Sequence, residues 1–139
     1  MRNDTITHIN GCRVVLMDSI SLIGPDDVGT IIISGSHGGQ ISGAFAALHA
    51  PSLVIFNDAA VGKNCAGIAS LHYLASTGIA AATVSHTSAR IGDALDAWES
   101  GVVSHRNSVA VALGVDVGAS SQEAVSIVTR SLKARRGGT

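Results

Sequence analysis

The 139-residue sequence predicts a single α/β domain, residues 1–139, in which helices cover both faces of a short, mostly parallel sheet of about four strands. Four short runs rich in branched residues are apolar throughout, which is typical of strands buried on both faces. The segments that follow the second and third runs are long enough for a helix and a return, which favours parallel neighbours with right-handed crossovers. With 46% hydrophobic residues, a chain of this length can bury a substantial core. The sequence therefore predicts a three-layer domain with a helical C-terminal third.

The four predicted strands are residues 13–17 (RVVLM), 30–34 (TIIIS), 52–56 (SLVIF) and 81–85 (AATVS). Between the first two lies SISLIGPDDVG, which offers at most one helical turn before Pro25. Because this connection is short of a full crossover helix, the first strand could pair with the second in either direction.

Helices are predicted over residues 39–50, 88–101, 104–114 and 120–133. Ser88 is a candidate N-cap of the second, and Ser120 with Glu123 forms a capping-box pattern at the start of the fourth. The first has no clearly polar face, which a monomer of this size covers with difficulty. We therefore expect a homo-oligomer.

Composition and charge exclude several classes of function. The net charge is −1 at pH 7, and Lys and Arg are scattered apart from a short basic tail, so no face for nucleic acid is visible. No apolar stretch approaches the roughly 20 residues that span a bilayer, and the N-terminus lacks the apolar core of a signal peptide. Cys12 and Cys65 match no metal or disulfide framework, which favours free thiols. We expect a cytoplasmic protein with no membrane or nucleic-acid partner.

Polar residues cluster directly after three of the predicted strands. The clusters are GSHGG (residues 35–39), NDAAVGK (57–63) and HTSAR (86–90). Open α/β sheets bind ligands at the carboxyl ends of their strands, so the three clusters predict one shared crevice for a small molecule. The expected catalytic residues are Ser36, His37, Asp58 and His86, and the expected ligand-binding residues are Gly35, Gly38, Gly39, Asn57, Lys63, Ser88 and Arg90.

Each cluster also has a purely structural interpretation. Glycines allow a sharp turn between strand and helix, but at a helix start they also let backbone N–H groups meet an anion. Asp58 could simply cap a helix, and His86 could be a buried, satisfied histidine. Arg90 lies in the first turn of its predicted helix, where the helix dipole disfavours a cation, so a bound carboxylate or phosphate would explain it.

Three chemistries can be assembled from these residues. Ser36 could be a nucleophile, because SGSHG has small residues two before and two after the serine, with Asp58 and His86 as its partners. His37, His86 and Asp58 could instead form a metal site, although no local ligand spacing supports it and we expect no cofactor. In the third, His37 and Asp58 act as general acid and base on a substrate held by Arg90 and the glycine amides, which needs the fewest assumptions.

The stretch PDDVGTIIISGSHGG (residues 25–39) resembles class I glutamine amidotransferase-like proteins, in which an acidic turn leads to an apolar strand and a glycine-rich oxyanion turn. The next strand, APSLVIFNDAAVG, stands where that superfamily has its nucleophile strand, so the resemblance covers about a third of the chain. It implies a flavodoxin-like (Rossmann-like) layer order and an oxyanion- or anion-binding turn at Gly35, Gly38 and Gly39. Asn57 and Asp58 stand in place of the family's nucleophilic Cys, so amidotransferase activity is not implied.

The function that these observations favour is an enzyme, a hydrolase, lyase or isomerase, that transforms a small polar, anionic metabolite by acid–base chemistry. Two other classes fit the same sequence. One is a ligand-binding or regulatory module without turnover, and the other is a structural subunit of an oligomeric enzyme.

Overall fold

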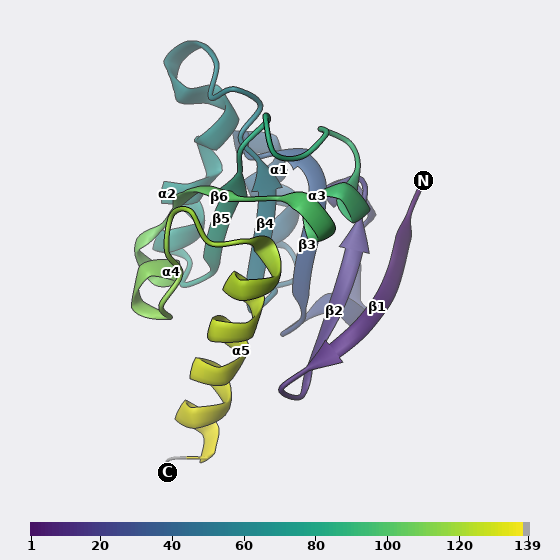
Figure 1. The fold of residues 1–139 in the computed structure, drawn as a ribbon, viewed down its shortest axis with the longest axis vertical. Helices are drawn as coiled ribbons and strands as arrows, with labels where there is room; N and C mark the ends of the chain where they lie inside the picture. Colours follow the sequence, from purple (N-terminus) through teal and green to yellow (C-terminus); the bar gives the residue numbers. More distant parts are fainter. Residues whose placement is uncertain (138–139) are drawn as a thin grey trace.

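The structure, a computed structural model, describes residues 1–137 and has an α/β fold built on a six-stranded mixed sheet (Figure 1). The strands lie side by side in chain order, from β1 to β6. They are β1 (Asn3–Ile9), β2 (Cys12–Met17), β3 (Ile31–His37), β4 (Leu53–Asn57), β5 (Ala80–Val84) and β6 (Val103–Arg106). Strands β2 to β5 are parallel to one another, whereas the edge strands β1 and β6 are antiparallel to β2 and β5.

The α/β class is confirmed, and β2 to β5 coincide with the four predicted strands within a few residues. The predicted number of strands is wrong, because the sheet also has β1 and β6. Strand β1 joins β2 through Asn10 and Gly11, both in the left-handed region with φ of 50° and 82°. Asn-Gly between two strands is a strong hairpin signal, so this pair of residues could have revealed β1.

The helices are η1 (Ile20–Leu22), η2 (Pro25–Asp27), α1 (Gln40–Ala47), η3 (Lys63–Ile68), α2 (Ser70–Ser76), α3 (Ala94–Ser100), α4 (Ser108–Ala112) and α5 (Ser121–Gly137), where η denotes a 3-10 helix. The capping box of α5 is confirmed, because Ser120 N donates to Glu123 Oε1 at 3.2 Å and Glu123 N donates to Ser120 Oγ at 3.1 Å. Only 3-10 turns occur between β2 and β3, yet these strands are parallel.

Two predicted helices begin later than expected. The helix predicted over 88–101 starts at Ala94, because Asp93 rather than Ser88 caps it and accepts a hydrogen bond from Asp96 N at 3.0 Å. The helix predicted over 104–114 is wrong for its first three residues, which form β6. Asn107 then caps α4 through a 3.0 Å hydrogen bond from Ala110 N, so the C-terminal third is not wholly helical.

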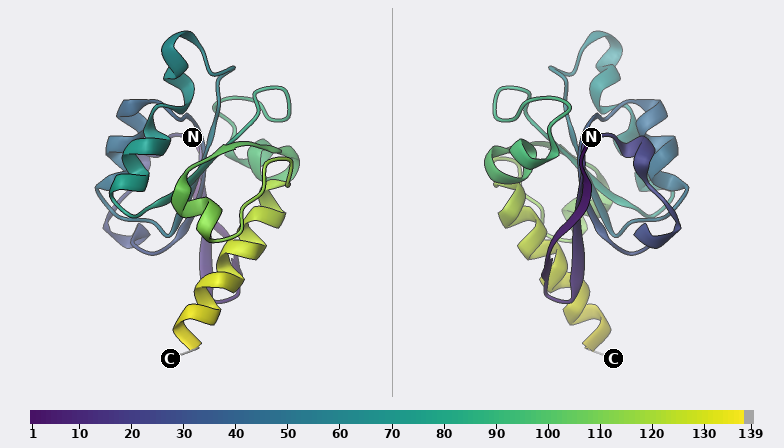
Figure 2. Two further views of the ribbon diagram at one scale, coloured as in Figure 1. Left: turned by 90° about the vertical axis from the view of Figure 1, so that its left-hand side faces the viewer. Right: turned by 90° about the vertical axis from the view of Figure 1, so that its right-hand side faces the viewer.

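Buried side chains form two clusters that alternate along the strands. Val14, Ile31, Leu53 and Ala80 belong to one cluster with residues of α3, α4 and α5. Their neighbours one residue further along belong to the other, with residues of α1 and α2. Alternation of side chains across a strand puts these clusters on opposite sides of the sheet. Figure 2 shows α1 and α2 on one side and α3 and α5 on the other.

Helix α1 keeps an apolar outer side. Ile41 is 74% exposed and Leu48 is 69% exposed. Among residues 1–137, no helix combines the length and the apolar character that crossing a membrane requires.

Candidate functional site

Four consecutive parallel strands end in an alternation of acid and histidine. Asp18 follows β2 directly, His37 is the last residue of β3, Asp58 follows β4 directly and His86 comes two residues after β5. Because parallel strands bring their carboxyl ends to one edge, all four residues lie at the edge of the sheet where α/β proteins bind ligands. Asp18 was missed by the sequence reasoning, although an acidic residue directly after an apolar run was a signal.

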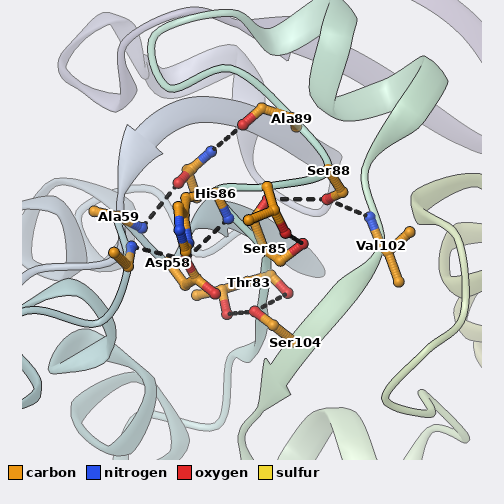
Figure 3. Close-up of polar contacts among 12 residues, drawn as sticks. Asp58, Ala59, Thr83, Ser85, His86, Ser88, Ala89, Val102 and Ser104 are labelled. Atoms are coloured by element: carbon orange, nitrogen blue, oxygen red, sulfur yellow. Dashed lines mark hydrogen bonds and ion pairs between the residues drawn. The ribbon is translucent and has the colours of Figure 1, made fainter.

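Asp58 and His86 form the central polar pair of this edge (Figure 3). The Asp58 side chain is 6% exposed and its Oδ1 lies 3.3 Å from Nδ1 of His86, whose side chain is 51% exposed. The same Oδ1 accepts hydrogen bonds from the backbone N–H groups of His86 at 3.0 Å and Ala60 at 2.9 Å. A buried carboxylate thus fixes one side of the imidazole while the other side faces outward.

The charge of Asp58 decides which nitrogen of His86 carries the proton. Burial raises the pKa of the Asp58 carboxyl, but the Ser104 hydroxyl, the N–H groups of Ala60 and His86 and the His86 ring outweigh it, so the pKa lies below its usual range. An ionised carboxylate only accepts hydrogen bonds, so Nδ1 of His86 must donate. In the neutral ring, Nε2 then has a free lone pair and can take a proton.

A pair of hydroxyl groups lies beside Asp58. The Ser104 and Thr83 hydroxyl oxygens are 2.9 Å apart, and Ser104 comes from β6, the antiparallel strand beside β5 (Figure 3). Sequence reasoning missed both residues, because residue 104 was expected at the start of a helix and Thr83 inside a buried strand.

Asn57 has a structural position beside the pair. It is 1% exposed, its Nδ2 donates to Ala89 O at 2.9 Å and its Oδ1 accepts from Ala59 N at 2.8 Å. The side chain therefore ties the chain after β5 to the end of β4.

The chain after Asp58 has an unusual backbone. Ala59, Ala60 and Val61 are all in the left-handed region, with φ of 52°, 62° and 67°. Left-handed conformations are costly for residues with a Cβ atom, and most so for a β-branched one. Three hydrogen bonds hold the turn: Ala59 N donates to Asn57 Oδ1, Ala60 N donates to Asp58 Oδ1, and Val61 N donates to Asp58 O at 2.7 Å.

Two glycines let η3 approach this turn and the chain after β3. A Cβ atom on Gly67 would lie 2.0 Å from Asp58 O, and one on Gly38 would lie 2.7 Å from Gly67 O. The backbone N–H of Gly38 donates to Asn57 O at 3.1 Å and that of Gly39 donates to His37 Nδ1 at 3.0 Å. Both amides are thus engaged within the protein, while Gly35 O accepts from Gly92 N at 2.7 Å.

His37 has the opposite tautomer to His86. Its Nδ1 accepts the Gly39 N–H, so the proton of the neutral ring is on Nε2. His37 lies on the wall of a cavity of about 650 Å³ between η1, α1 and η3, together with Ser36, Gly39 and Lys63. The exposed Lys63 thus lines the same cavity as His37, although the two residues come from different polar clusters of the sequence.

Ser36 is not joined to a histidine by any hydrogen bond among residues 1–137. Its Oγ accepts from Ile20 N at 3.0 Å, and its own N–H donates to Ser34 Oγ at 3.0 Å. Ser36 and His37 also line a second hollow of about 450 Å³ with Asp18. The arrangement lacks the bond from nucleophile to base that a serine nucleophile uses.

The remaining expected ligand residues lie in the segment before α3. Ser88 Oγ donates to Ser85 O and accepts from Val102 N, both at 2.9 Å. Arg90 precedes α3 rather than lying in its first turn; its side chain is 81% exposed and lies 3.9 Å from the Asp93 carboxylate. Ser88 therefore fastens this segment to the chain before β6, and Arg90 faces solvent.

No three His, Cys, Asp or Glu side chains within residues 1–137 lie close enough together to hold a metal ion. The structure joins His86 to Asp58 but does not bring His37 to them as a third ligand.

Comparison with known protein families, characterised proteins and solved structures gives no match for this chain. The chemistry of the site therefore has to be argued from its own residues.

Proposed function

We propose that this protein is an enzyme, a hydrolase, lyase or isomerase, that transforms a small polar, anionic metabolite by acid–base chemistry, with His86 as the group that moves the proton. One observation carries the proposal: the half-exposed imidazole of His86 lies 3.3 Å from the carboxylate of the buried Asp58. A carboxylate that holds a histidine in one tautomer and stabilises its protonated form is a recurrent device of acid–base catalysis.

Asp58 pairs with His86 and not with His37. The sequence favoured His37 and Asp58 as acid and base, whereas the geometry favours Asp58 as the positioning residue for His86. His37, with its proton on Nε2, is suited to donate a hydrogen bond to a substrate oxygen.

The fold-level part of the proposal is a three-layer order and a cytoplasmic homo-oligomer. The flavodoxin-like arrangement is not kept, because these strands follow chain order whereas a flavodoxin-like sheet has its first two strands exchanged. The two clusters of buried residues support the layers. The exposed apolar side chains of Ile41 in α1 and of Leu48, its C-cap, support self-association. Light scattering of the purified protein tests the oligomer, since a monomer at working concentration would contradict it.

The activity is tested by incubating the protein with a panel of small 2-oxo acids, hydroxy acids, amides and phosphate esters and following conversion by NMR. We expect turnover of at least one compound. The His86→Ala variant should lower kcat by about 10²- to 10⁴-fold, because positioned proton transfer contributes that much.

The matched control is His8→Ala, which removes an exposed histidine of β1. His8 lies beside the β1–β2 turn, at the opposite end of β2 from the site. Its kcat should equal that of the wild-type protein. Full activity of folded His86→Ala contradicts the proposal. Saturable binding without conversion indicates a binding module, and co-purification of an inactive protein with another chain indicates a structural subunit.

A further inference from the structure

The cavity beside His37 has a second feature that the acid–base pair does not use. Its wall includes the first turn of α1, at Gln40, Ile41 and Ser42. The first hydrogen bond within the helix is donated by Gly43 to Gly39 O at 3.0 Å. The N–H groups of the three residues before Gly43 therefore lack partners within the helix, and they carry its partial positive charge.

Ser42 provides an independent sign of a ligand. Its side chain is buried, with 5% of the residue exposed, and it lines the cavity. Within residues 1–137 the structure shows no hydrogen bond to its hydroxyl. Every fully enclosed side-chain N or O atom of these residues has a partner, so the Ser42 oxygen is not fully enclosed. The hydroxyl is thus open to the cavity and has no partner in the described part of the chain, so it is available to a ligand.

The charges around the cavity favour an anion. Lys63 on η3 contributes a cation, and no Asp or Glu side chain lines this cavity. His37 adds a ring whose proton is on Nε2, which makes it a further donor. A lysine, a hydroxyl and helix N–H groups together form the donor set that proteins use for phosphate.

The rest of the wall is uncharged and in part apolar. Ile20, Ile41 and Phe45 line the cavity beside the donors. These side chains offer a surface for carbon groups rather than for a second charged group. The wall thus suits a ligand with an anionic group at one end and an uncharged body at the other.

We propose that this cavity binds the phosphate group of a small organic phosphate, held by the first turn of α1, the Ser42 hydroxyl and Lys63. The claim that the bound compound is also the substrate rests on the proposed function. Binding itself is independent of turnover, so the two can be tested separately.

The test uses phenyl phosphate and inorganic phosphate as probes, with benzoate as the carboxylate comparison, in NMR titrations of the ¹⁵N-labelled full chain. Phenyl phosphate should shift the amide signals of Gln40, Ile41 and Ser42 saturably, and it should bind more tightly than either other probe. Ser42→Ala and Lys63→Gln should each weaken binding about tenfold, because each loses a hydrogen bond to a charged group.

Matched controls are Ser126→Ala and Lys133→Gln on α5, which remove the same groups far from α1. Both should bind phenyl phosphate as the wild-type protein does, and His86→Ala should also retain binding. The inference fails if phenyl phosphate gives no saturable shift, if benzoate binds as tightly, or if folded Ser42→Ala and Lys63→Gln bind normally. Binding of phenyl phosphate by a protein that converts none of the panel compounds would overturn the proposed function and leave this inference standing.

Discussion

Oδ1 of Asp58 accepts hydrogen bonds from both the backbone and the side chain of His86, at 3.0 Å from its N and 3.3 Å from its Nδ1. One atom thus fixes where His86 leaves the strand and how its ring is turned.

Replacement of Asp58 by Asn should lower stability in a manner that depends on pH. The folded-state pKa of Asp58 is lowered, so its contribution is present above the unfolded pKa of about 3.9 and is lost as the pH falls through the folded value. We expect Asp58→Asn to lower the free energy of unfolding by about 1–3 kcal/mol at pH 7.

This difference should shrink below about pH 4, where the wild-type carboxylate becomes protonated. Urea denaturation across the pH range measures it, with the exposed Asp26→Asn as the control. A difference that is independent of pH would show that the charge of Asp58 does not stabilise the fold.

The two histidines at this edge should show opposite tautomers. His86 donates from Nδ1 to Asp58, whereas His37 accepts at Nδ1 from Gly39 N. Long-range ¹H–¹⁵N correlation spectra of the neutral rings should therefore place the proton of His86 on Nδ1 and that of His37 on Nε2. Asp58→Ala should release the preference of His86 and leave His37 unchanged, and the same tautomer at both rings would contradict the geometry.

Gly67 should tolerate no side chain. A Cβ atom there would lie 2.0 Å from Asp58 O, which is a backbone atom. We expect Gly67→Ala to destabilise the protein by about 3 kcal/mol or more, because the turn after β4 must move. Gly24→Ala is the control, since nothing lies within 4 Å of a Cβ atom at that position. Equal midpoints of thermal unfolding for the two variants would refute the close approach.

Asn57 should act on stability rather than on ligand affinity. In Asn57→Ala, the buried Ala89 O and the part-buried Ala59 N each lose their partner, and each unpaired group costs about 1–3 kcal/mol. We expect a total loss of about 2–4 kcal/mol in chemical denaturation. Asn3→Ala, on the exposed strand β1, should cost little. A stable Asn57→Ala protein with weakened ligand binding would instead support the sequence-based expectation of a binding role.

The buried strands could be predicted because burial on both faces leaves a continuous apolar run, as in residues 13–17 and 52–56. The edge strands could not be found this way. Strand β6 carries the polar residues Ser104, His105 and Arg106. Because these residues directly precede a helical pattern, they were assigned to the predicted helix. Its pairing with β5 is a long-range contact, and only that contact brings Ser104 to Thr83.

The candidate site was predictable to the level of strand ends. The clusters that contain Asp58 and His86 were expected to meet because β4 and β5 were expected to be parallel. The sequence could not predict which histidine bonds to Asp58, because the answer depends on the backbone conformation of the few residues after each strand. Ser88 and Arg90 likewise lie elsewhere than predicted, because Asp93 and not Ser88 caps α3.

The left-handed turn of Ala59, Ala60 and Val61 shares its anchor with the imidazole. Ala60 N and the His86 ring both bond to Oδ1 of Asp58, so the turn and the ring share one acceptor. Thermodynamic linkage then makes them coupled equilibria: binding of a ligand at His86 alters the population of the turn, and melting of the turn alters the affinity of His86 for that ligand. Relaxation measurements on the amide of Ala60 would therefore report on chemistry at a side chain 26 residues further along the chain.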